Sequence, residues 1–162
     1  MSNIGVHIAR FFVFILIQIF ILNNLEIPNG ALPMIYPLFI FLLPIEMNIV
    51  ALFGLSLLMG LILDILSNTF GLHTSSLLLF AYLRPWILKR FAPREDYEAN
   101  KEANYYTMGR NWFFYTFGSL ILFQNLWFFL FEVSDLGSIW FILQKTLISA
   151  PLSFLLCVGI QI

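Results

Sequence analysis

The sequence predicts an all-α polytopic membrane protein, with about six transmembrane helices in a single membrane domain over residues 1–162. Of the 162 residues, 60% are apolar and only 10% are charged, and the mean hydropathy is +0.90. Soluble domains carry about 25% charged residues, and a chain of this length cannot bury so much apolar surface beneath a charged coat. Composition therefore excludes a soluble enzyme and a disordered chain. The 8 basic and 9 acidic residues give a net charge of −1, which excludes a nucleic-acid binder.

Six apolar stretches account for the predicted helices. A transmembrane helix needs about 20 mostly apolar residues, and candidates lie near residues 6–22, 32–45, 49–66, 72–88, 112–131 and 138–162. Their connections are short except for a loop over residues 92–111. The first stretch has a basic flank, but no small-x-small cleavage site follows it, so we expect a retained helix rather than a signal peptide.

Lysine and arginine positions predict the orientation. If all six stretches cross and the N-terminus is cytoplasmic, seven of the 8 basic residues face the inside. These seven are Arg10, Arg84, Lys89, Arg90, Arg94, Lys101 and Arg110. The expected outer loops hold only the acidic residues Glu26, Glu132 and Asp135. We therefore expect both termini and the 92–111 loop to be cytoplasmic.

The second stretch is the least regular, because it is short and contains Pro33, Pro37 and Pro44. Proline lacks a backbone donor, so we expect a short, tilted or broken crossing whose freed backbone groups bind neighbouring spans. A re-entrant segment is the alternative. With five crossings and an outer N-terminus only Arg10 would be misplaced, so the preference for six crossings depends mainly on that residue.

Two ionisable residues fall inside the predicted spans. Asp64 lies near the outer end of the third span, and Lys145 lies roughly 10 Å deep in the sixth, at 1.5 Å per residue. Charges in spans are costly and mark functional hypotheses. We expect either an Asp64–Lys145 ion pair within a polar cluster, or two charges that reach the outer headgroups separately. If the two do not meet, Asp64 should contact polar groups on the fourth span or the headgroups.

Small residues recur every four positions beside both charges. Ser56 and Gly60 precede Asp64, and Ser149 and Ser153 follow Lys145. Small residues at this spacing let helix backbones approach closely in lipid. We therefore predict that both rows are helix-packing faces, with chance occurrence as the alternative.

A basic and aromatic segment ends the fourth span, where the residues are Arg84, Trp86, Lys89 and Arg90. Tryptophan and clustered basic side chains are typical of the membrane–water boundary on the cytoplasmic side. We predict an interfacial segment that faces anionic headgroups.

No pattern in the sequence indicates catalysis. His7 and His73 are far apart, and there is no metal-ligand motif, phosphate-binding glycine loop or nucleophile elbow. Asp64 has no neighbouring carboxylate for acid–base chemistry. We therefore expect a protein that is not an enzyme and needs no cofactor or metal.

Several short motifs occur in a recognisable order along the chain. They are Gly60-Leu61-Ile62-Leu63-Asp64, then Gly71 after a polar turn, then Ala81-Tyr82-Leu83, with Pro33 and Pro151 on either side. In this order they resemble the rod shape-determining protein family MreD, over nearly the whole chain. Thr69-Phe70-Gly71-Leu72-His73 and Tyr82-Leu83-Arg84-Pro85 are similar to its Bacteroidota branch. Members usually end in a short basic tail, whereas this sequence ends at Ile162 within apolar residues.

This resemblance implies a non-catalytic scaffold of the cell-elongation complex, in the cytoplasmic (inner) membrane of a bacterium, that supports cell shape and peptidoglycan synthesis. The implied partner is MreC. The implied further neighbours are MreB filaments, the glycosyltransferase RodA and a class B penicillin-binding protein. The implied fold is similar to the six-helix substrate-binding component of energy-coupling-factor transporters.

The alternative is the substrate-binding membrane subunit of a small-molecule, vitamin-type transporter. Such a subunit should enclose an outward pocket near Asp64, Lys145 and Gln124. We prefer the scaffold, because that group of transporters often carries small-x-x-x-small rows on its first span and residues 11–16 contain none.

Overall fold

The computed structural model describes residues 4–25, 27–92, 103–134 and 138–161, so half of the expected 92–111 loop, residues 93–102, lies outside the described residues. All regular structure within these ranges is helical. The α-helices are α1 (Ile4–Phe20), α2 (Pro37–Leu42), α3 (Ile49–Ser67), α4 (Leu72–Arg90), α5 (Tyr105–Met108), α6 (Arg110–Val133) and α7 (Ile139–Gln161). Two short 3-10 helices, η1 (Leu22–Asn24) and η2 (Pro28–Gly30), follow α1.

Four helices in the described part of the chain are long and apolar enough to cross a membrane. They are Gly5–Asn24, Ile49–Ser67, Arg110–Val133 and Ile139–Gln161. Helix α4 has the same length as α3, 19 residues, but is less apolar, because it carries three basic side chains and a histidine. Helix α2 has only 6 residues. The chain thus has the long apolar helices of an α-helical membrane protein.

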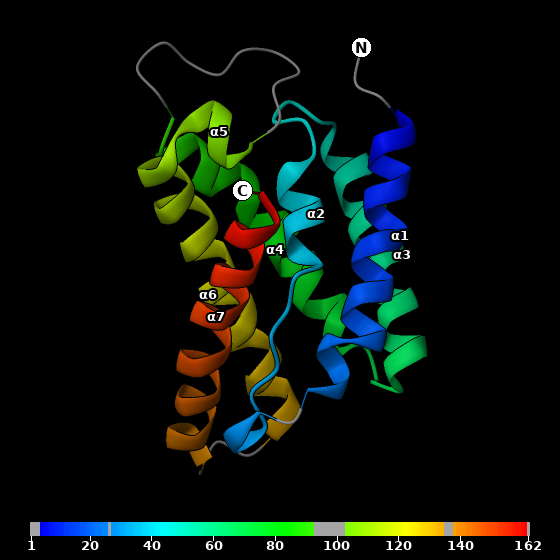
Figure 1. Ribbon diagram of the computed structural model, residues 1–162, viewed down its shortest axis with the longest axis vertical. Coiled ribbons are helices and arrows are strands. Elements are labelled where there is room, and N and C mark those ends of the chain that lie inside the picture. The colour runs from blue at the N-terminus through cyan, green and yellow to red at the C-terminus, as the bar shows by residue number, and fades with distance from the viewer. Residues whose placement is uncertain (1–3, 26, 93–102, 135–137, 162) are drawn as a thin grey trace.

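The long helices lie side by side along the longest axis of the molecule (Figure 1). Helix α3 packs against α1 and α4, and α6 packs against α4 and α7. Helix α2 lies inside this arrangement, where it contacts α1, α3 and α4. The N-terminus lies at the upper end of the molecule in Figure 1, whereas η2 and the start of α7 lie at the lower end. We call these the terminal end and the η2 end.

Residues 31–36 form a drawn-out, non-helical segment that connects η2 at one end of the molecule with α2 near the other (Figure 1). Prolines explain this shape. Pro33 lacks an N–H and disfavours helix in the residue before it. Pro37 then occupies the first turn of α2, where no backbone donor is needed. Met34, Ile35 and Tyr36 are at most 1% exposed, so this irregular backbone is enclosed by the surrounding helices.

Side chains from α1 and α7 bind the backbone of this segment. Ser149 accepts a hydrogen bond from the N–H of Leu32 at 2.9 Å, and Ser153 accepts one from the N–H of Met34 at 2.8 Å. Gln18 accepts from the N–H of Ile35 and donates to the carbonyl of Pro33, both at 3.0 Å. Backbone polar groups at membrane depth must find such partners, because lipid supplies none.

Candidate functional site

Asp64, near the end of α3, caps the start of α4 with its carboxylate. Its Oδ1 accepts from the Thr69 hydroxyl at 2.5 Å and the His73 N–H at 2.9 Å. Its Oδ2 accepts from the Thr74 N–H at 2.9 Å and the Thr74 hydroxyl at 2.5 Å. The N-cap residue Gly71 has no side chain, so Asp64 supplies the acceptor that α4 otherwise lacks. Its negative charge is favourable at a helix N-terminus.

The expected ion pair between Asp64 and Lys145 is wrong. Lys145 Nζ instead donates to Glu132 Oε2 at 2.6 Å, and its ammonium lies 5.2 and 5.3 Å from the ring centroids of Phe129 and Phe141. The reason is that α6 continues to Val133, so Glu132 lies on the helix beside α7 rather than in an outer loop. The carboxylate of Asp64 instead accepts hydrogen bonds from His73 and Thr74 of α4. This agrees with the alternative expectation, that Asp64 contacts polar groups on the fourth span.

The predicted packing row on α3 meets α4 at Gly60. A Cβ atom at position 60 would lie 2.5 Å from the Thr74 Cα, so only glycine allows this approach of the two backbones. Ser56 is buried, and its hydroxyl donates to the Leu52 carbonyl of its own helix at 2.8 Å.

The predicted row on α7 has a different function from the expected one. Ser149 and Ser153 face the irregular residues 31–36 and accept backbone N–H groups from them. The spacing of four residues is therefore matched to a non-helical segment rather than to a second helix. Ser149 and Ser153 do lie on one buried face of α7, as predicted, but they bind backbone N–H groups instead of packing against another helix.

Arg84 is not part of an interfacial segment, because it points into the protein and is only 1% exposed. Its Nη2 donates to the backbone carbonyls of Phe41, Leu43 and Pro44, where α2 ends. A cation is favourable at a helix C-terminus. Trp86, Lys89 and Arg90 are exposed, as an interfacial position requires.

A buried polar network lies beneath the Asp64 cap. Tyr36 Oη lies 3.0 Å from both His73 Nδ1 and Gln124 Nε2, and 3.4 Å from Met34 Sδ. The four residues come from three parts of the fold, since Met34 and Tyr36 belong to the crossing segment of residues 31–36, His73 to α4 and Gln124 to α6. Sequence reasoning placed Gln124 near a polar cluster but missed Tyr36 and His73, because both look like ordinary members of apolar stretches.

An open cavity of about 560 Å³ lies at the η2 end, beside this network. Its polar wall comprises Asn23, Asn24, Ser67, Thr69, His73 and Glu132. Its apolar wall comprises Ile19, Phe20, Leu32, Leu66, Leu72 and Phe128. The cavity adjoins the hydrogen-bond partners of Asp64 and the ion-pair partner of Lys145, although neither charged residue lines it.

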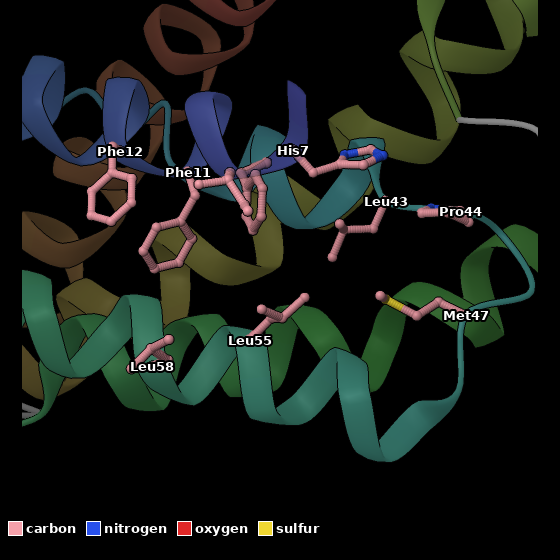
Figure 2. Close-up of a pocket in the computed structure, with 10 residues that line it drawn as sticks. His7, Phe11, Phe12, Leu43, Pro44, Met47, Leu55 and Leu58 are labelled. Atoms are coloured by element: carbon pink, nitrogen blue, oxygen red, sulfur yellow. The ribbon is translucent and has the colours of Figure 1, made fainter. Parts of the chain in front are cut away.

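A second, apolar groove of about 410 Å³ opens between α1 and α3 (Figure 2). Phe11 and Phe12 come from α1, Leu55 and Leu58 from α3, and Leu43 lies between them after the end of α2. The side chains project toward one another across the groove, and His7 and Met47 lie toward its terminal end (Figure 2). Such a surface can pack against hydrocarbon, either lipid or a partner helix.

The described residues contain no group of three or more His, Cys, Asp or Glu side chains that could hold a metal ion. Three charged contacts connect different elements of the chain. Asp64 binds the start of α4, Arg84 binds the end of α2, and Lys145 of α7 pairs with Glu132 of α6. Each contact stabilises the fold. The comparisons with protein-family models, curated proteins and solved structures found no match for this chain.

Proposed function

We propose that this protein is a non-catalytic scaffold of the bacterial cell-elongation complex, with the role that the MreD family has, and that it binds MreC through its membrane helices. One observation carries the proposal. The motif residues Gly60, Asp64 and Gly71 together form the α3–α4 corner. Gly60 allows the backbones to approach, Asp64 caps α4, and Gly71 adopts a φ of +82° at the turn.

This corner also argues against catalysis by the intramembrane aspartate. Both carboxylate oxygens of Asp64 accept two hydrogen bonds each from the first turn of α4 and from Thr69. A general acid or base needs a free lone pair or proton directed at substrate. The motif therefore supports a structural role, which fits a scaffold better than an enzyme.

Six crossings are part of the proposal. The segment from η2 to α2 connects the two ends of the molecule, and α4 packs between α3 and α6 with eight buried residues. Adding this segment and α4 to the four long apolar helices gives six crossings. The N-terminus then lies on the same side as the basic residues Lys89 and Arg90. That side is the cytoplasm, and the membrane is the inner membrane of a bacterium. The fold is then similar to the substrate-binding component of energy-coupling-factor transporters.

This scaffold would bind its partners through helix surfaces that face the lipid. The groove between α1 and α3 is an apolar surface of the kind that membrane helices pack against (Figure 2). MreB, RodA and a class B penicillin-binding protein would be further neighbours in the same complex.

A second candidate function is the substrate-binding subunit of a small-molecule transporter. The cavity at the η2 end favours it, because its volume of about 560 Å³ is within the usual range of ligand sites. The deciding experiment is depletion of the protein in its host. The scaffold predicts loss of cell shape, if the host is rod-shaped, without loss of uptake of any single nutrient. An uptake defect with normal shape would contradict it.

A further inference from the structure

The cavity at the η2 end contains more hydrogen-bond acceptors than its own side chains use. This property is independent of the scaffold role, which depends on lateral surfaces. The three residues that matter are His73, Glu132 and Asn24, all of which line the cavity.

His73 Nδ1 lies 3.0 Å from Tyr36 Oη, and the direction of this hydrogen bond depends on the tautomer of His73. Tyr36 Oη has one proton and two lone pairs, and Gln124 Nε2 donates to one of these lone pairs. Tyr36 can give its proton to Met34 Sδ, at 3.4 Å, and accept from His73 Nδ1. In that tautomer His73 is neutral with its proton on Nδ1, and Nε2 is an acceptor.

His73 Nε2 has no hydrogen-bond partner among the described residues, although the side chain is only 1% exposed. Since Nδ1 is directed at Tyr36 in the interior, the opposite edge of the ring is the one available to the cavity. An acceptor in a largely buried ring that has no protein partner can accept a hydrogen bond from the donor of a ligand in the cavity.

Glu132 and Asn24 supply two further acceptors. Lys145 occupies Oε2 of Glu132, which leaves Oε1 without a partner in the described part of the chain, on a side chain that is 35% exposed. Asn24 donates both hydrogen bonds of its Nδ2 to the carbonyls of Ile19 and Phe20, at 3.2 and 3.0 Å. Its Oδ1 therefore remains as an acceptor.

We propose that this cavity binds a protonated organic amine with an apolar body. The ammonium group donates to Glu132 Oε1, Asn24 Oδ1 and His73 Nε2, and its binding selects the His73 tautomer with the proton on Nδ1. The apolar body lies against the opposite wall, which contains Phe20, Leu66 and Phe128. The charge of Asp64 takes no part, because α4 already saturates its carboxylate.

The test compares two probes of nearly equal shape, phenethylamine and 2-phenylethanol, by titration calorimetry on the full chain in detergent. Only the amine carries a positive charge and three N–H donors. Charge-assisted hydrogen bonds are the stronger class, so the amine should bind in a saturable manner and roughly tenfold more tightly than the alcohol. Equal affinities, or no saturable binding of the amine, would overturn the proposal.

Two variants locate the site. Glu132→Gln should reduce amine affinity roughly tenfold, whereas Glu46→Gln near the terminal end should leave it unchanged. Because Glu132→Gln also deprives Lys145 of its partner, Asn24→Ala provides a second test, with the helix-capping Asn48→Ala as its matched control. Unchanged affinity in Asn24→Ala and Glu132→Gln together would place the amine elsewhere and overturn the site.

The ammonium group has two possible sources, a free amine or the headgroup of phosphatidylethanolamine. The same titration in nanodiscs of phosphatidylethanolamine or phosphatidylcholine distinguishes them. Competition by the ethanolamine lipid alone assigns the site to a headgroup, and equal probe affinity in both lipids assigns it to a free amine. The readout does not involve MreC, so failure of this inference leaves the scaffold proposal unaffected.

Discussion

The carboxylate of Asp64 and the first turn of α4 are joined at Thr74, which donates to Oδ2 through both its N–H, at 2.9 Å, and its hydroxyl, at 2.5 Å. Helix α3 thus carries the N-cap acceptor of the helix that follows it. The contact explains how a charge can persist at 5% exposure without a cationic partner among the described residues, since the helix dipole and the hydrogen bonds replace the ion pair.

Replacing Asp64 should therefore destabilise the fold. Asp64→Ala removes four hydrogen bonds and leaves the N–H groups of His73 and Thr74 without acceptors. The expected loss is roughly 1–3 kcal/mol, measured by thermal unfolding in detergent. Glu46→Gln, at an exposed position in a loop, is the control. If both variants unfold at the same temperature, Asp64 is not the cap that the structure shows.

The ion pair of Lys145 predicts energetic coupling with Glu132 and none with Asp64. A double-mutant cycle with Lys145→Met and Glu132→Gln should give a coupling energy of roughly 0.5–3 kcal/mol, because either single change leaves one charge without its partner. The matched cycle combines Lys145→Met with Asp64→Asn and should be additive. Coupling confined to the Asp64 cycle would restore the pairing that the sequence suggested.

The serines of α7 should matter only where they meet the crossing segment. Ser149→Ala and Ser153→Ala each leave a buried backbone N–H without its acceptor, at Leu32 or Met34, and should cost roughly 1–3 kcal/mol each. Ser119→Ala is the control, since the Ser119 hydroxyl donates to the Tyr115 carbonyl of its own helix. Thermal unfolding in detergent again provides the measurement. Equal effects at all three positions would mean that hydroxyl loss, rather than the crossing segment, decides stability.

Two glycines on α3 provide a further contrast. Gly60→Ala introduces a Cβ atom 2.5 Å from the Thr74 Cα, so α3 and α4 must separate and stability should fall. Gly54→Ala meets no atom within 4 Å and should be neutral or gain up to about 1 kcal/mol of helix propensity. The measurements are the folded yield and the unfolding temperature of the two variants in detergent, which should be lower for Gly60→Ala than for Gly54→Ala. A tolerated Gly60→Ala would show that the α3–α4 contact is looser than the structure indicates.

The long apolar helices and the irregular second stretch could be predicted from the sequence. Hydropathy windows identify α1, α3, α6 and α7, and three prolines indicate that residues 32–45 cannot form a regular helix. These features depend on local composition and on backbone chemistry, which a sequence displays directly.

The partners of the polar residues could not be predicted in the same way. Hydropathy gives the depth of Asp64 and Lys145 but not the direction in which each side chain points around its helix axis. Hydropathy also predicts that the fifth span ends at residue 131, which places Glu132 in a loop rather than beside Lys145. The sequence groups Arg84 with the basic residues beside it, whereas the rotation of α4 turns Arg84 toward the end of α2.

Copurification from native membranes tests the scaffold role most directly. The chain carries an affinity tag, is solubilised in mild detergent, and its partners are quantified by mass spectrometry against an untagged strain. The account predicts enrichment of MreC at a stoichiometry comparable to the bait, with no enrichment of a transporter ATPase. Robust copurification of a transporter ATPase module, and none of MreC, would contradict it.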